Sequence, residues 1–150
     1  MLSTHKHILQ TILFSAIFAC CQIGTLAHAQ ADAPTVGTQQ SESGIRHSFL
    51  VTGSITAIIG EDNKIKWQVP GRSRDGFVLP NGNVLVSIAN SAREYTRDGK
   101  LVFQYKLDPV NKELGTVVRL KSGNTMVVER GAKPRILEIT PAGKIAVDVP

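Results

Sequence analysis

The predicted mature chain has no cysteine. The sequence of 150 residues contains two cysteines, Cys20 and Cys21, and both lie in an N-terminal segment that we interpret as a signal peptide. Without them no disulfide can cross-link the folded chain, and thiolate metal sites and cysteine nucleophiles are excluded. We therefore expect packing and hydrogen bonds alone to stabilise the fold.

Histidine and aromatic residues are also scarce. Of four histidines only His47 follows the predicted signal peptide, and one histidine without a clear partner makes neither a catalytic triad nor a metal site. Removing Lys6 leaves 16 basic residues against 12 acidic ones, a dispersed net charge of +4. With few aromatic residues for base stacking, this composition argues against nucleic acid as a partner.

No apolar run is long enough for a comfortable membrane span. The most apolar stretch, residues 8–19, follows a weakly basic start and precedes Ala27-His28-Ala29, an A-x-A cleavage site. We expect residues 1–29 to be a signal peptide, Gln30 to be the mature N-terminus, and the protein to be periplasmic or secreted. Lipoprotein processing at either cysteine is one alternative, and an uncleaved anchor is another.

Residues 30–46 are small and polar and contain almost no apolar side chains. Such a segment cannot bury enough surface to offset the entropy lost when it becomes ordered. We predict a flexible tether over this range.

The rest of the chain lacks any helical period and instead repeats short β-type runs separated by Gly, Pro, Asn and Asp. Residues 79–87 recur 41 positions later at 120–128, and the hairpin at 95–103 recurs 44 positions later at 139–147. A third copy of the hairpin lies at 59–67. This repeat predicts an all-β fold of four-stranded antiparallel blades of the β-propeller type, about two and three-quarter blades in total.

Turn glycines mark the predicted hairpins. Asn81-Gly82 fits a two-residue type I′ turn, in which both residues need positive φ. Corresponding turns close at Gly99, Gly123 and Gly143. Residues 84–86 are apolar without alternation, which predicts a strand covered on both faces. Three aromatic residues on outer strands are predicted to pack between blades: Trp67, Phe103 and Tyr105.

The repeats resemble those of the quinoprotein-like (PQQ-like) β-propeller superfamily and are similar to the propeller of bacterial arylsulfotransferases. The segments that carry the likeness are LPNGNVLVS, EYTRDGKLVFQY, GTVVRLKSGNTMVVE and PRILEITPAGKIAV. The resemblance covers about residues 47–150. The residues themselves indicate no cofactor, and pyrroloquinoline quinone is implied only by the resemblance.

The repeat units are incomplete as a propeller. We predict a partial blade over residues 47–70 and full blades over 71–108 and 109–150, whereas a closed propeller needs at least four. We therefore expect a fragment, or one part of a larger assembly. Uncovered blade faces predict self-association, completion by another chain, or aggregation.

The connections between blades (residues 71–75 and 108–114), and between the second and third strands of a blade (residues 88–92 and 130–134), are predicted to be longer and more charged than the hairpin turns. Functional groups concentrate on such loops. The planar, two-pronged guanidinium group of arginine suits anionic groups. These loops form one rim of the predicted blades. The rim and its strand ends carry five candidate arginines: Arg72, Arg74, Arg93, Arg130 and Arg135. The alternative is a solvated surface with weak local ion pairs to Asp75, Asp108, Glu113 and Glu129.

We therefore expect an exported β-propeller repeat module that is not catalytic by itself and binds an unidentified ligand or protein. No residue is singled out as catalytic or as a metal ligand. The alternative is a fragment of a periplasmic quinoprotein-like or arylsulfotransferase-like enzyme, which rests on the repeat resemblance. The coding sequence after Pro150 would separate the two hypotheses.

Overall fold

The computed structural model describes residues 37–150. The predicted signal peptide, its two cysteines and the start of the predicted tether lie outside the described residues. Within them the chain forms eleven strands and no helix: β1 (Phe49–Val51), β2 (Thr56–Ile59), β3 (Ile65–Val69), β4 (Ser73–Val78), β5 (Val84–Ile88), β6 (Ser91–Tyr95), β7 (Leu101–Lys106), β8 (Asn111–Arg119), β9 (Thr125–Gly131), β10 (Arg135–Ile139) and β11 (Ile145–Val149).

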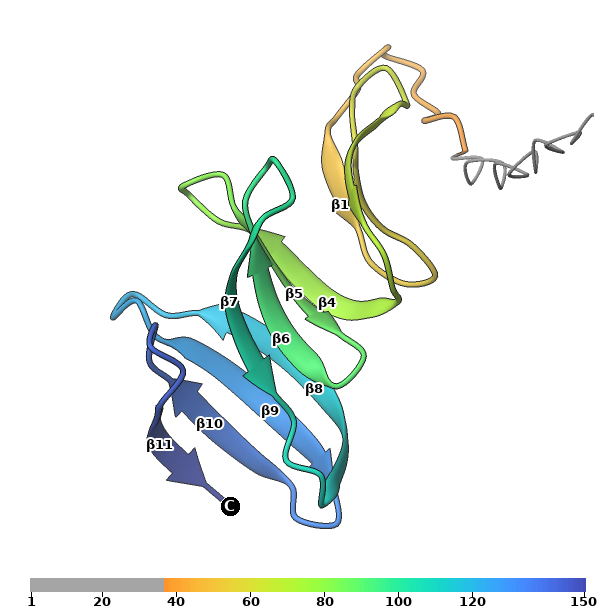
Figure 1. Ribbon diagram of the computed structural model, residues 1–150. Helices are drawn as coiled ribbons and strands as arrows, with labels where there is room; N and C mark the ends of the chain where they lie inside the picture. Colours follow the sequence, from red (N-terminus) through yellow and green to blue (C-terminus); the bar gives the residue numbers. More distant parts are fainter. Residues whose placement is uncertain (1–36) are drawn as a thin grey trace, which may run out of the picture. The chain divides into compact units, whose positions relative to one another are not determined.

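The strands form three antiparallel sheets, each a simple meander in chain order (Figure 1). The first sheet contains β1–β3, the second β4–β7 and the third β8–β11. This arrangement confirms the all-β prediction of four-stranded blades, with the first blade lacking one strand. In the second and third sheets the first strand lies at one edge, and β8 packs beside β4 and β5.

One turn geometry closes five hairpins. In the first hairpin of the second sheet, the Leu79 N–H donates to the Asn83 carbonyl and the Gly82 N–H donates to the Leu79 carbonyl, both at 2.8 Å. Gly82 has φ 84°, whereas Asn81 is not at positive φ. The two-residue type I′ interpretation of Asn81-Gly82 is therefore wrong. The loop is a three-residue type I turn ending in a left-handed residue, which suits proline at its first position.

The other four turns repeat this pattern with the same pair of backbone hydrogen bonds. Gly99, Gly123 and Gly143 hold the left-handed position with φ of 85°, 87° and 79°. In the first sheet Asn63 takes that place with φ 59°. Asparagine tolerates this region better than most residues, which is why the turn survives there without glycine.

The inter-blade connections are shorter than predicted, because β4 and β8 begin earlier than the sequence pattern indicates. Register shifts between Ser73 and Asp75 in β4, and between Asn111 and Glu113 in β8, mark β-bulges. A bulge admits an extra residue without breaking the strand. The long loops predicted at 71–75 and 108–114 are thus largely strand.

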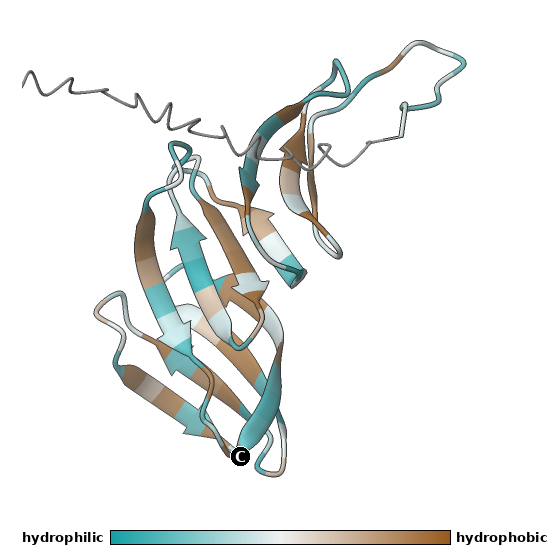
Figure 2. Cartoon of the chain, turned by 45° about the vertical axis from the view of Figure 1, so that its right-hand side comes forward, coloured by the Kyte–Doolittle hydropathy of each residue, from teal (hydrophilic) through white to brown (hydrophobic). Residues whose placement is uncertain are grey.

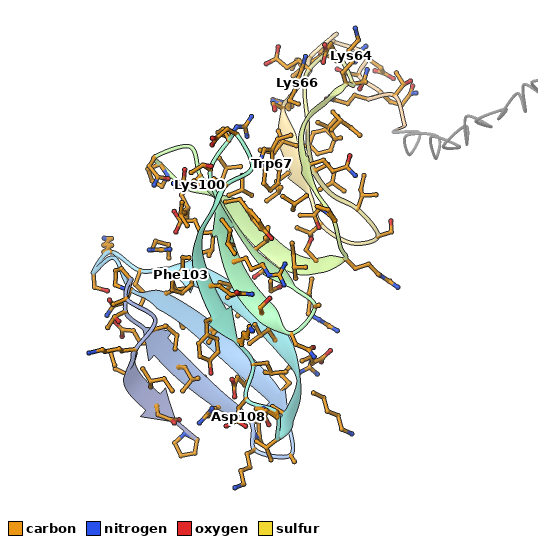
Figure 3. All side chains as sticks on the ribbon, viewed as in Figure 1. Lys64, Lys66, Trp67, Lys100, Phe103 and Asp108 are labelled. Atoms are coloured by element: carbon orange, nitrogen blue, oxygen red, sulfur yellow. The ribbon has the colours of Figure 1, made fainter. Side chains whose placement is uncertain are left out.

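The core lies between successive sheets. Trp67, 6% exposed, packs between the first and second sheets, and Phe103, 7% exposed, packs between the second and third (Figure 3). Residues 84–86 of β5 are fully buried, which confirms that this strand is covered on both faces. Figure 2 shows hydrophobic residues alternating with hydrophilic ones along many of the strands. Each sheet therefore depends on its neighbour to bury a face.

Residues 37–46 form no strand, but part of this predicted tether is hydrogen-bonded to the first sheet. The Gln39 N–H donates to Asn63 Oδ1 at 3.1 Å, and the Gln39 side chain donates to the His47 carbonyl at 2.9 Å. Among residues 37–150 no helix has the length and apolar character that crossing a membrane requires.

Candidate functional site

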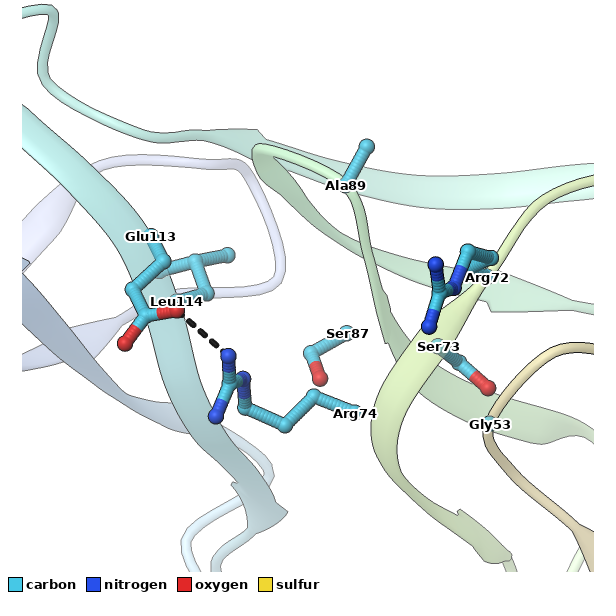
Figure 4. A pocket seen from close by; sticks show the side chains of 8 residues that line it. All are labelled: Gly53, Arg72, Ser73, Arg74, Ser87, Ala89, Glu113 and Leu114. Carbon is cyan, nitrogen blue, oxygen red and sulfur yellow. Dashed lines mark hydrogen bonds and ion pairs between the residues drawn. The ribbon is translucent and has the colours of Figure 1, made fainter.

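An open hollow of about 430 Å³ lies where residues of all three sheets meet (Figure 4). We call it the arginine hollow. Its lining comes from the β1–β2 connection, the start of β4, the end of β5 and β8: Gly53, Arg72, Ser73, Arg74, Ser87, Ala89, Glu113 and Leu114.

Two arginines reach the arginine hollow from the start of β4, beside a bulge. Arg72 immediately precedes β4, and Arg74 is the residue without a cross-strand partner, because Ser73 pairs with Ile88 while Asp75 pairs with Ser87. In a regular strand, side chains two residues apart share a face and the intervening one points away. Here Ser73 also contributes to the lining, and Figure 4 shows the two guanidinium groups on either side of Ser87.

Glu113 links the arginine hollow to a second one. Its Oε2 lies 2.5 Å from an Arg74 guanidinium nitrogen, and its Oε1 lies 3.0 Å from one of Arg130. Arg130 and Lys112 line the second hollow, of about 510 Å³. The two arginine side chains are 54% and 58% exposed, so each ion pair contributes only about 0–1 kcal/mol.

Arg72 differs from Arg74 in the contacts of its guanidinium group. Within residues 37–150 no carboxylate lies within ion-pair distance of its guanidinium. Arg72 and Arg74 against Glu113 leave this lining with a net positive charge. Such a surface attracts anions and repels cations.

The backbone of the lining is strained at Ala89. This residue has φ 51° in the tight connection between β5 and β6. A side chain other than that of glycine in the left-handed region costs about 1–3 kcal/mol, and such outliers cluster at functional sites. The strain at Ala89 therefore supports a functional role for this rim.

The remaining candidate arginines lie elsewhere. Arg93 donates to Ser91 Oγ at 2.8 Å and to the Tyr95 hydroxyl at 3.2 Å on its own strand. Arg135 pairs with three carboxylates and is 20% exposed, so its guanidinium is already occupied. The structure thus places Arg72 and Arg74 in the arginine hollow and pairs Glu113 with both Arg74 and Arg130, whereas Arg93 and Arg135 line neither this hollow nor the second one.

Arg135 belongs to a network centred on Glu129, whose side chain is fully buried. Glu129 Oε1 accepts hydrogen bonds from the Tyr105 hydroxyl at 2.6 Å and the Asp108 N–H at 3.0 Å. Its Oε2 accepts from Asn111 Nδ2 at 2.7 Å and Arg135 Nε at 2.9 Å. Figure 3 places Asp108 beside the third sheet.

These contacts set the protonation of the network. Burial by itself would raise the pKa of Glu129, but the hydrogen bonds from Tyr105, the Asp108 backbone, Arg135 and Asn111 outweigh it and hold the pKa below its ordinary value. Burial and the hydrogen bond to Glu129 raise the pKa of the Tyr105 hydroxyl. Glu129 is therefore an ionised structural centre that positions the β7–β8 connection.

Sequence reasoning missed the serine and backbone parts of the arginine hollow and the role of Glu129. Ser73, Ser87 and Gly53 carry no sequence signal, since only the bulge and the β1–β4 contact bring them together. Glu129 did carry a sequence signal, because it lies on the same face of β9 as the buried Thr125 and Val127, at two-residue spacing. A charged residue in phase with a buried face predicts a satisfied internal carboxylate.

His47 is exposed, and its backbone bonds to Gln39. Over the described residues, 37–150, no three His, Cys, Asp or Glu side chains are grouped so that they could hold a metal ion.

Comparison with known proteins finds a similar fold in a protein of unknown function. No family model matches the chain, and no curated protein matches it. Among the solved structures that match is the crystal structure of a protein of unknown function from Bacteroides caccae, with a TM-score of 0.59 and 27% sequence identity. The match covers 69% of this chain and 40% of that one, so this chain corresponds to less than half of that protein's length.

Proposed function

We propose that the protein is an exported, non-catalytic binding module of the propeller type, and that its arginine hollow takes an anionic group of a ligand or partner protein. The observation that carries the proposal is the placement of Arg72, without an ion-pair partner within residues 37–150, in the same hollow as Arg74. Membership of the quinoprotein-like propeller superfamily is part of the proposal and rests on the repeat segments in residues 47–150.

The chemistry of the arginine hollow favours a carboxylate, sulfate or phosphate group. A guanidinium offers a planar, two-pronged donor that matches such anions. Arg74 can exchange its exposed contact with Glu113 for a ligand oxygen at a cost of about 0–1 kcal/mol. Ser73 and Ser87 lie on the paired strands β4 and β5, so the sheet holds the backbone beneath the two arginines in place.

Titration calorimetry with sodium sulfate, sodium phosphate and sodium succinate tests this proposal. Two exposed arginines without an enclosing pocket predict a dissociation constant on the order of 1 mM, which corresponds to about 4 kcal/mol of binding free energy. Arg72→Ala and Arg74→Ala are each expected to weaken binding at least about fivefold, because each removes one guanidinium fork.

Arg97→Ala is the matched control. Arg97 is exposed in the β6–β7 turn and does not line the arginine hollow, so its replacement removes the same charge without touching the site. We expect it to leave binding unchanged. Equal losses from Arg72→Ala and Arg97→Ala would mean that only net charge matters, and the proposed site would be wrong. Absence of binding of all three anions would also contradict the proposal.

A further inference from the structure

The third sheet has one face that no described residue covers. Side chains on β9, β10 and β11 form this open face: Met126, Val128, Ile136, Glu138, Val147 and Val149. They are in register across the sheet, with Met126 opposite Glu138 and Glu138 opposite Val147. Ile136, Val147 and Val149 are 45%, 45% and 49% exposed. Apolar side chains this exposed on one sheet face mark an interaction surface.

The second sheet shows what covers the equivalent positions. Leu85, Glu94 and Phe103 pair across β5, β6 and β7 as Met126, Glu138 and Val147 do across β9, β10 and β11. Leu85 is fully buried, and Glu94 and Phe103 are each 7% exposed. The third sheet packs on this face and buries it.

The first sheet follows the same rule. Ile58 and Trp67 pair across β2 and β3 at the positions of Glu94 and Phe103. They are 4% and 6% exposed, because they pack against the second sheet. Two successive sheets in this chain thus bury the same face with the sheet that follows.

The charge on the open face specifies its partner more closely. Glu94 Oε1 accepts a hydrogen bond from Asn83 Nδ2 at 2.7 Å, and its Oε2 pairs with Arg119 on β8 of the following sheet. That guanidinium also lies over the Phe103 ring, 5.5 Å from its centre. A carboxylate at a buried interface needs such a cation to offset the loss of water.

Glu138 accepts the same asparagine hydrogen bond as Glu94. Its Oε1 accepts from Asn124 Nδ2 at 2.7 Å, and Asn124 occupies in the third sheet the turn position that Asn83 occupies in the second. Over residues 37–150 its Oε2 has no hydrogen-bond donor. The asparagine therefore aims the carboxylate at the open face, where the counterpart of Arg119 would stand.

We propose that the open face binds a further four-stranded antiparallel sheet of the same repeat type, whose first strand carries an arginine that pairs with Glu138. Exposed Ile136, Val147 and Val149 pack against that strand and its neighbour, as Ala92, Phe103 and Tyr105 pack against the third sheet. The proposal does not depend on anion binding at the arginine hollow.

An extended chain tests the proposal with a defined partner. Tyr105 and Val149 are equivalent, so Pro150 corresponds to Lys106, and a second copy of residues 107–150 placed after Pro150 continues the repeat in register. The second copy of Arg119 then falls opposite Glu138. Unfolding of the full chain and of the extended chain in urea, followed by circular dichroism, measures the effect.

We expect the extended chain to unfold in one transition at a higher urea concentration than the full chain. Glu138→Gln should raise the unfolding equilibrium constant about tenfold in the extended chain and less than twofold in the full chain. Replacing the second Arg119 by Met should remove most of that difference, which a double-mutant cycle measures directly. A second cycle, which combines Glu94→Gln with Arg119→Met in the first copy, measures the coupling energy of the Glu94–Arg119 pair as a reference.

Two results would overturn the proposal. Two separate unfolding transitions, or equal effects of Glu138→Gln in both chains, would show that the added sheet does not dock on the open face. A dimer of the full chain that dissociates on Ile136→Asp in sedimentation would show that a second copy covers this face instead.

Discussion

Replacement of Glu129 by glutamine is the most informative perturbation of the third sheet. The buried carboxylate accepts four hydrogen bonds, two on each oxygen. Glutamine keeps one oxygen acceptor and turns the other position into an NH2 group, which faces two donors. Two hydrogen bonds to a charged acceptor are therefore lost, each worth about 1.5–3 kcal/mol before relaxation.

We expect Glu129→Gln to lower the free energy of unfolding at pH 7 by about 2–4 kcal/mol, after allowing for partial relaxation around Arg135, which is 20% exposed. For a domain of this size such a loss lowers the melting temperature on the order of 10 °C. Urea unfolding followed by the fluorescence of Trp67, the single tryptophan of the chain, measures it. Glu61→Gln, at an exposed turn position, is the matched control and should change little.

The pH dependence separates the charge from the shape of the side chain. The folded-state pKa of Glu129 lies below its ordinary value, so its stabilisation is fully present above the unfolded-state pKa of about 4.3. That stabilisation is lost as the pH falls through the lower folded-state pKa. The difference in stability between the natural chain and Glu129→Gln should thus shrink as the pH falls below about 4.5. A difference under about 0.5 kcal/mol at pH 7, or one that stays constant down to pH 3, would refute this reasoning.

Three further predictions concern the backbone and the N-terminus. Ala89→Gly should raise the free energy of unfolding by about 0.5–1 kcal/mol, because it relieves the strain of a φ of 51°. The control Ala92→Gly, within β6, should lower the free energy of unfolding. Equal effects of the two variants in denaturant melts would contradict the strain argument. Gly131→Ala should lower the free energy of unfolding by more than about 2 kcal/mol, because a Cβ would lie 2.6 Å from a backbone nitrogen of β8. Gly99→Ala, at φ 85° with open space around it, should lower it by only about 1 kcal/mol. The reverse order in urea melts would contradict the packing argument. Gln30 should be the first residue of the exported protein by N-terminal sequencing, and a lipid-modified cysteine instead would contradict this cleavage site.

The sequence predicted the repeat and its buried strands because these depend on local patterns. Alternation, apolar runs such as residues 84–86, and glycine at the left-handed turn position are all set by neighbours in the chain. The turn type at Asn81-Gly82 was wrong because Pro80, the preceding residue, already favours a three-residue type I loop.

The candidate site could be predicted only in part, because it depends on long-range contacts. The bulge in β4 lets Ser73 join Arg72 and Arg74 in the lining, and nothing in the sequence places an extra residue there. Arg135 looked like a rim arginine, yet Glu129, six residues earlier in the chain, occupies it. Whether a charged side chain is free or paired is decided by strand register, which local pattern does not fix.

Amide chemical-shift mapping of the protein titrated with sodium sulfate tests the central claim most directly. We expect the largest shifts at Arg72, Arg74 and Ala89, with saturation at millimolar anion. In Arg72→Ala, saturation should require at least about fivefold more sulfate. Shifts spread evenly over surface arginines, or concentrated at the β6–β7 turn around Arg97, would contradict an anion site in the arginine hollow.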